Sequence, residues 1–115
     1  MESEIVNDQP WNQCFGCSPY NEKGLQLRFR QNDDGTVECR YEAEEHLVGP
    51  PGAMHGGIQA VLLDEVMGTA ARLNSTSDTS WAVTAELQLK YRRPVPVGQA
   101  LRVRARLVRT EGRNL

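Results

Sequence analysis

The chain has 115 residues, carries a formal net charge of −2 at neutral pH and has an isoelectric point near 5.7. This length fits one domain, and so small a charge gives no global bias toward nucleic acid or a membrane surface. No apolar run approaches the roughly 20 residues of a membrane span, and the acidic start Met1-Glu2-Ser3-Glu4 lacks a signal-peptide pattern. We therefore expect a cytoplasmic protein without nucleic-acid or membrane partners.

The first segment, residues 1–13, is predicted to be a loose acidic arm before a single domain at 14–115. Cys14-Phe15-Gly16-Cys17 opens this domain with the CxxC spacing of metal and redox sites. The chain has no second such pair, and a zinc site would have to recruit His46, His55 or another subunit. In a cytoplasmic protein the cysteines need not form disulfides. We therefore interpret the motif as a compact turn and expect no metal.

Strands are predicted where apolar and polar residues alternate with a period of two. Asp33-Asp34-Gly35 is typical of a hairpin turn and joins the first two of these segments. Each segment has one apolar face, as in an antiparallel sheet that is covered on one side. The four segments span residues 25–30, 37–42, 81–91 and 101–107.

One helix is predicted, at about 57–73, because its apolar residues recur at helical spacing. Nothing else in the chain can cover the apolar surface of this helix except the sheet. The order strand, strand, helix, strand, strand therefore predicts an α+β fold in which one antiparallel sheet wraps one central helix. At this size a pocket is more easily built between two copies, so we also expect a homo-oligomer.

His55-Gly56-Gly57 lies directly before this helix, and a carboxylate follows at Asp64. Free backbone N–H groups at a helix N-terminus attract developing negative charge, and a carboxylate can act as base or nucleophile. Asp64 lies on a stripe of glycines and alanines, where an unpaired buried charge is costly, whereas the adjacent Glu65 lies on the side of Arg72. This pattern predicts a site for attack on a carbonyl, with Asp64 as its acid.

The positive charge is concentrated near the C-terminal end of the chain. Solvated strand faces and a basic margin that meets an anionic ligand both explain this pattern. The residues concerned are Lys90, Arg92, Arg93, Arg102, Arg104, Arg106, Arg109 and Arg113.

The order of elements and motifs resembles the hotdog fold, and more narrowly the acyl-CoA thioesterase branch related to 4-hydroxybenzoyl-CoA and phenylacetyl-CoA thioesterases. The matching motifs are Cys14-Phe15-Gly16-Cys17, Gly24-Leu25-Gln26-Leu27-Arg28-Phe29, Gly52-Ala53-Met54-His55-Gly56-Gly57 with Asp64, Tyr91-Arg92-Arg93-Pro94-Val95-Pro96-Val97-Gly98, and Gly112-Arg113.

This resemblance implies hydrolysis of an acyl-CoA thioester at a dimer interface, without a cofactor. It implies that Asp64 activates water or attacks directly, and that Gly56, with Gly57 adjacent, donates a backbone N–H to the thioester oxygen. It further implies that His55 shapes and polarises the site and that Thr84 assists the acid or the water. Candidates for contact with the CoA phosphates are Arg92, Arg93 and Arg113.

The sequence departs from the resemblance at two places. Many relatives have an Asn or Gln shortly before the glycine turn, where this chain has Gly49-Pro50-Pro51, so we expect no second side-chain contact to the carbonyl. The family sheet has at least one more strand after Gly112-Arg113. We therefore expect a free sheet edge that a second subunit covers, or a shortened chain, or impaired activity.

Three other functions remain open at this point. A hotdog hydratase or dehydratase acting on enoyl thioesters would use His55 and Asp64. A binding module or structural dimer would hold acyl-CoA without cleaving it. A metal or redox protein would use Cys14 and Cys17.

Overall fold

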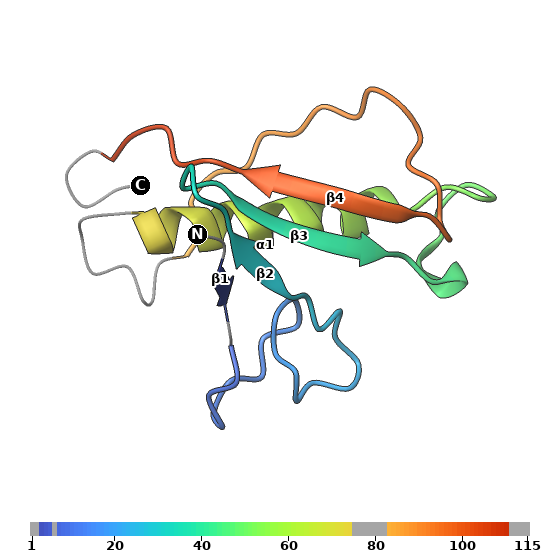
Figure 1. The fold of residues 1–115 in the computed structure, drawn as a ribbon. Coiled ribbons are helices and arrows are strands. Elements are labelled where there is room, and N and C mark those ends of the chain that lie inside the picture. Colours follow the sequence, from blue (N-terminus) through green and yellow to red (C-terminus); the bar gives the residue numbers. More distant parts are fainter. Residues whose placement is uncertain (1–2, 6, 75–82, 111–115) are drawn as a thin grey trace.

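The computed structural model describes residues 3–5, 7–74 and 83–110, in which a four-stranded antiparallel sheet lies against one long helix (Figure 1). The strand order is β1-β2-β3-β4, which is also the order in the chain. Sequence and structure thus agree on an α+β arrangement with one central helix. The elements are β1 (Ser3–Ile5), β2 (Phe29–Gln31), β3 (Val37–Glu42), the short 3₁₀ helix η1 (Glu45–Leu47), α1 (Gly56–Asn74) and β4 (Ala100–Ala105).

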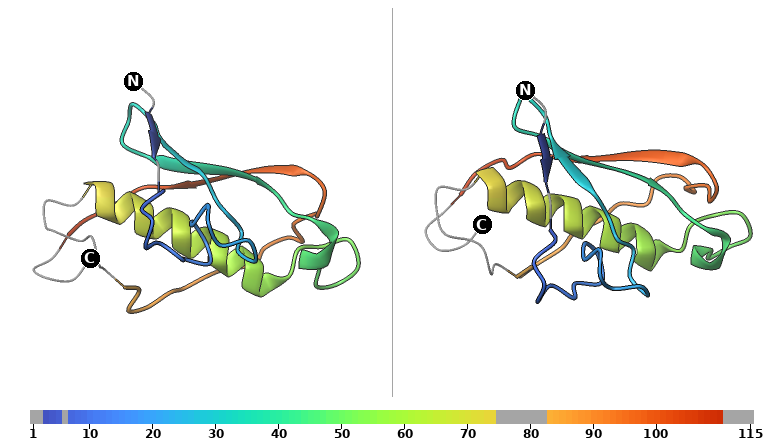
Figure 2. Two further views of the ribbon diagram at one scale, coloured as in Figure 1. Left: turned by 90° about the horizontal axis from the view of Figure 1, so that it is seen from below. Right: turned by 60° about the horizontal axis from the view of Figure 1, so that its bottom comes forward.

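The core lies between α1 and the sheet, because the helix packs along β3 and β4 (Figures 1 and 2). The predicted alternation is confirmed in β3, where Val37 and Cys39 face the core. The helix turns a different face toward the sheet from the one that carries Asp64. That buried helical face consists of Leu62, Val66, Thr69 and Ala70.

The predicted hairpin between β2 and β3 is confirmed, with Phe29 opposite Cys39. Gly35 has φ of +85°, a conformation that glycine adopts without a steric penalty. Asp34 accepts hydrogen bonds from the backbone N–H and the hydroxyl of Thr36, at 3.0 and 2.6 Å. The Asn74 side-chain amide donates to Gly35 O at 3.1 Å, so the end of α1 is attached to this turn.

Residues 3–5 differ from the prediction of a loose arm, because they form β1 and pair with β2. The pairing uses backbone groups at the edge of β2 and needs no hydrophobic alternation in the added strand. A segment of three residues is too short to show a period in the sequence.

The strand predicted over 81–91 is wrong for its described part, since residues 83–91 form no ladder. This segment runs beside α1, on the side away from β3 (Figure 2). Its side chains are mostly exposed. Within the described chain, β4 has β3 on one edge and no strand on the other. Segment 83–91 is instead bonded to α1, through Thr84 to Asp64 and through Tyr91 to Gly56, and does not pair with the open edge of β4.

The first predicted strand is shorter than expected, because β2 begins only at Phe29. The N–H groups of Leu25 and Leu27 instead donate to Phe15 O and Gly16 O, at 2.8 and 2.9 Å. These bonds fix the compact turn predicted at the CxxC motif. None of the described helical segments combines the length and hydropathy needed to cross a membrane.

The outer face of the sheet holds a nearly buried acid, Glu38, whose side chain is 5% exposed. Arg102 donates two hydrogen bonds to its Oε1, at 2.8 and 3.1 Å, and Asn32 donates a third at 2.9 Å. These hydrogen bonds, foremost the one from Arg102, lower the pKa of Glu38 from its ordinary 4.5 to about 2. The charged form of Glu38 is therefore favoured in the folded state.

This cluster predicts an acid-sensitive contribution to stability. Because the folded pKa is depressed, the contribution is complete above about pH 4.5 and is lost as the pH falls toward 2. We expect Glu38→Gln to be less stable than the wild type at pH 7 and to lose less stability on acidification over that window. Urea unfolding at both ends of the window measures this, with Glu42→Gln on the exposed end of β3 as the control. Parallel pH profiles for the wild type and Glu38→Gln would contradict it.

Candidate active site

The first turn of α1 has one backbone donor left open. Gly57 N–H donates to His55 Nδ1 at 2.9 Å, and the N–H groups of Ile58 and Gln59 both donate to His55 O, at 3.0 and 3.1 Å. For the Gly56 N–H, the described part of the chain provides no acceptor. The positive end of the helix dipole therefore presents a single unused N–H at Gly56.

His55 acts as the N-cap of α1 through its own ring. Because Nδ1 accepts a hydrogen bond, the neutral imidazole carries its proton on Nε2. The ring is exposed, so Nε2–H can donate to a molecule bound at the turn. The backbone of this turn is held by two bonds, His55 N–H to Leu47 O at 2.8 Å and Met54 N–H to Val95 O at 2.7 Å.

A pocket of about 340 Å³ opens beside Gly56. Tyr91 forms part of its wall, and its hydroxyl donates to Gly56 O at 2.8 Å. The pocket includes two of the three predicted phosphate contacts, Arg92 and Arg93, whereas Arg113 lies outside the described residues. The lining consists of Pro50, Ala53, Met54, Gly56, Gln59, Tyr91, Arg92, Arg93 and Pro94.

Asp64 and Thr84, which are twenty positions apart in the chain, lie in contact. The Thr84 hydroxyl donates to Asp64 Oδ1 at 2.6 Å. This bond fixes one oxygen of the carboxylate. It also holds the start of segment 83–91 against the helix, as the bond from Tyr91 holds its end.

The surroundings of Asp64 differ from the buried, unpartnered setting expected for it. The side chain is half-exposed and accepts the bond from Thr84. The small-residue stripe on which it lies faces away from the sheet, with Gly68 exposed and Met67 39% exposed. The neighbouring acid Glu65 is also half-buried, and burial raises its pKa, although a hydrogen bond from Cys14 opposes the shift.

The predicted site residues fall into two groups on one chain. His55, Gly56, Gly57, Arg92 and Arg93 gather at the start of α1. Asp64 lies eight residues after Gly56 on α1, which is about 12 Å on a helix rising 1.5 Å per residue. Thr84 lies beside Asp64, because its hydroxyl donates to the carboxylate. Reacting atoms must come within about 3–3.5 Å of each other. One chain therefore cannot bring the carboxylate and the Gly56 N–H to the same carbonyl.

Two polar pocket residues, Tyr91 and Gln59, were not identified as site residues from the sequence. Tyr91 is on the apolar phase of a predicted strand, which predicts burial, yet it is 55% exposed. Gln59 donates to Met54 O at 3.0 Å and has no motif around it. The place of Tyr91 depends on how segment 83–91 returns to the helix, which no local pattern indicates.

An antiparallel sheet laid against one central helix is the arrangement of the hotdog fold. In this chain a glycine turn begins the helix and an acid follows two turns later. Residues 51–115 match the family described as the thioesterase superfamily, and the chain belongs to that superfamily.

The curated relatives include acyl-coenzyme A thioesterase THEM4 of Bos taurus, 33% identical over 119 residues, which matches all of this chain and 47% of that protein. The THEM4 of Mus musculus is 37% identical over 70 residues, covering 61% of this chain and 28% of that protein. The chain thus spans less than half the length of these relatives.

Two solved structures are also similar. A thioesterase superfamily protein is 32% identical with a TM-score of 0.72, covering 83% of this chain and 45% of that one. A putative thioesterase from Ralstonia eutropha JMP134, described as phenylacetic acid degradation-related, is 33% identical with a TM-score of 0.64, covering 77% and 67%.

The capping role of His55 predicts a stability effect that is separate from chemistry. Removing an N-cap acceptor costs about 0.5–2 kcal/mol, so His55→Ala should lower the free energy of unfolding by that order. His55→Asn places an acceptor at the cap again and should recover most of the loss. Urea unfolding measures both, with His46→Ala on the exposed η1 as the control. Equal stability of His55→Ala and the wild type would show that the ring is not a cap.

Proposed function

We propose that this chain hydrolyses an acyl-CoA thioester to the free acid and CoA, at a site made by two copies of the chain. Membership of the thioesterase superfamily and the acyl-CoA thioesterase relatives support this reaction class. The observation that carries the proposal is the open Gly56 N–H at the head of α1, beside a pocket that contains two arginines.

The Gly56 N–H stabilises the oxygen that becomes negative when the thioester carbonyl is attacked. It acts with the helix dipole, and one such donor is commonly worth about 10²–10³ in rate. His55 supports the same oxygen or the carbonyl through Nε2–H. Arg92 and Arg93 lie at the pocket wall, where guanidinium groups bind the CoA phosphates.

Asp64 of the second copy acts as general base on the attacking water. Thr84 donates to its Oδ1, which orients the carboxylate and leaves Oδ2 for the water proton. The tetrahedral intermediate then collapses, the carbon–sulfur bond breaks and CoA leaves as the thiol after protonation. Direct attack by Asp64 through a covalent anhydride is the alternative within the same site.

The separation along α1 supports a site between copies. Within one chain Asp64 is about 12 Å from Gly56 along the axis, whereas two antiparallel copies of the helix bring the acid of one toward the turn of the other. The stripe of Gly57, Gly68 and Ala71, in which both glycines are exposed and Ala71 is half-buried, permits such an approach, because small residues let backbones come close. The copies then form a symmetric dimer.

The role of Asp64 predicts that Asp64→Asn keeps the fold and loses nearly all hydrolysis, because an amide cannot accept the water proton. Thr84→Ala should lower kcat more than it changes KM, and Thr84→Ser, which keeps the hydroxyl, should recover most activity. Release of free thiol from a panel of acyl-CoA esters measures both. Unchanged turnover in Asp64→Asn would reject the assignment. Tight binding without thiol release, or addition of water to an enoyl thioester, would reject hydrolysis.

The role of Gly56 predicts a contrast between two substitutions. A Cβ at this position meets the Tyr91 ring at 3.5 Å, an ordinary contact, and proline is favoured at the first residue of a helix. Gly56→Pro removes the N–H and should lower kcat by about 10²–10³, whereas Gly56→Ala keeps the N–H and should stay close to the wild type. Similar activity of the two variants would contradict the role.

Mixing Gly56→Pro with Asp64→Asn subunits tests the two-copy site. Each variant alone is inactive, but a mixed dimer contains one intact site, so a random equal mixture should recover about one quarter of the wild-type activity. No recovery after verified subunit exchange would place both groups in the same chain.

A further inference from the structure

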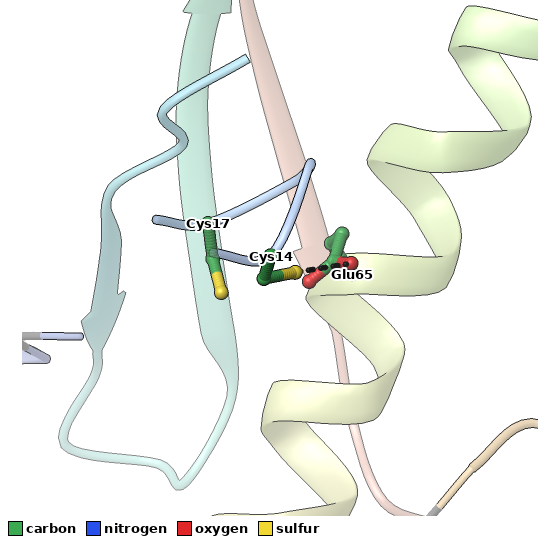
Figure 3. A group of neighbouring side chains, drawn as sticks. All are labelled: Cys14, Cys17 and Glu65. Atoms are coloured by element: carbon green, nitrogen blue, oxygen red, sulfur yellow. Dashed lines mark hydrogen bonds between the residues drawn. The ribbon is translucent and has the colours of Figure 1, made fainter. Parts of the chain in front are cut away.

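A second cluster of reactive side chains lies on another side of α1. Cys14 and Cys17 of the CxxC turn meet Glu65 of the helix, and the potential ligand atoms of the three residues all lie within 4.8 Å of one another. In Figure 3 the sulfur of Cys14 points at the Glu65 carboxylate, and Cys17 lies beside it. The Cys14 thiol donates to Glu65 Oε1 at 3.5 Å.

We propose that Cys14, Cys17 and Glu65 form a binding site for a thiophilic divalent cation, zinc by the chemistry of the donors, with water as a fourth ligand. Two thiolates and one carboxylate are a donor set that zinc accepts in four-coordinate sites. The third protein ligand comes from the central helix and not from either histidine.

The geometry of the cluster is close to that of a tetrahedral site. With zinc–sulfur and zinc–oxygen bonds of about 2.3 and 2.0 Å, adjacent ligands are separated by about 3.5 Å for sulfur–oxygen and about 3.8 Å for sulfur–sulfur. The observed Cys14–Glu65 distance of 3.5 Å matches the first value. Because no pair of ligand atoms is more than 4.8 Å apart, binding requires at most about 1.3 Å of closure for a sulfur–oxygen pair, which side-chain rotation supplies.

The turn that carries the cysteines is built against the carboxylate. A Cβ at Gly16, between the two cysteines, would clash with the Glu65 side chain in its present position, so glycine at this position lets the carboxylate lie against the turn. Buried Asn12 holds both thiol residues: its Oδ1 accepts from Cys14 N–H at 3.0 Å and its Nδ2 donates to Cys17 Sγ at 3.9 Å. A donor to a ligand sulfur is the kind of outer contact that orients metal ligands.

The charges of the cluster also suit a cation. All three side chains are half-buried, so an ion held among them would be partly shielded from solvent. A divalent cation would replace the two thiol protons, which are released to solvent, and the ion with its two thiolates and one carboxylate would carry a net charge of −1. Cys17 also lines a cavity of about 480 Å³, whose charged lining residues are Glu4, Asp8 and Arg28.

Titration of the reduced, metal-free full chain with Zn²⁺ against a competing chelator tests the proposal. We expect one ion per chain, a rise in Tm on binding, and a thiolate-to-metal charge-transfer band when Co²⁺ replaces Zn²⁺. Cys14→Ser, Cys17→Ser and Glu65→Gln should each weaken binding at least tenfold. Cys39→Ser, which removes the buried thiol outside the cluster, should bind as the wild type does.

Glu65→Gln decides the outcome if a cysteine variant fails to fold, because the amide keeps the shape of the side chain while losing its charge. Unchanged zinc affinity in folded Glu65→Gln would overturn the three-ligand site. Absence of stoichiometric binding by the fully reduced wild type would overturn the site altogether. Neither measurement depends on thioester hydrolysis.

Discussion

The rigid separation of Gly56 and Asp64 along α1 is the constraint on which the candidate site depends. A helix cannot fold back on itself, so the backbone positions of Gly56 and Asp64 stay about 12 Å apart along the axis in one chain. The same stiffness makes a site between two copies precise, because each group is held by a regular element and not by a loop. The proposed dimer follows from this distance and from the exposed face that carries Asp64.

The helix has a separate role on each of its faces. Leu62 and Val66 bury against the sheet and hold the helix in place. Asp64 lies on the open face, with Thr84 beside it. Glu65, one residue further and about 100° around the axis, meets the cysteine turn. Two adjacent acids therefore have different surroundings, since a single residue step moves a side chain to another face.

Much of the fold could be predicted from periodicity alone. The spacing of apolar residues predicts α1 to within a residue at either end, and the alternation around Asp33-Asp34-Gly35 predicts the β2–β3 hairpin. The same alternation fails for 83–91, because a period of two says that a segment can be a strand but does not supply a partner. The alternation also gives no sign of β1, because this strand pairs with the edge of β2 through backbone groups that every sequence has.

For the site, the sequence by itself determined the groups that are local: His55-Gly56-Gly57 at the start of the helix, Asp64 two turns later, and Arg92 and Arg93 before the prolines. Only the tertiary structure decided which of them meet. Thr84 reaches Asp64, Tyr91 reaches Gly56, and Glu65 reaches Cys14 across intervals of 20, 35 and 51 residues. Helical and strand periods act over a few residues, whereas such contacts depend on how loops return to the core, so they are visible only when the whole chain has folded.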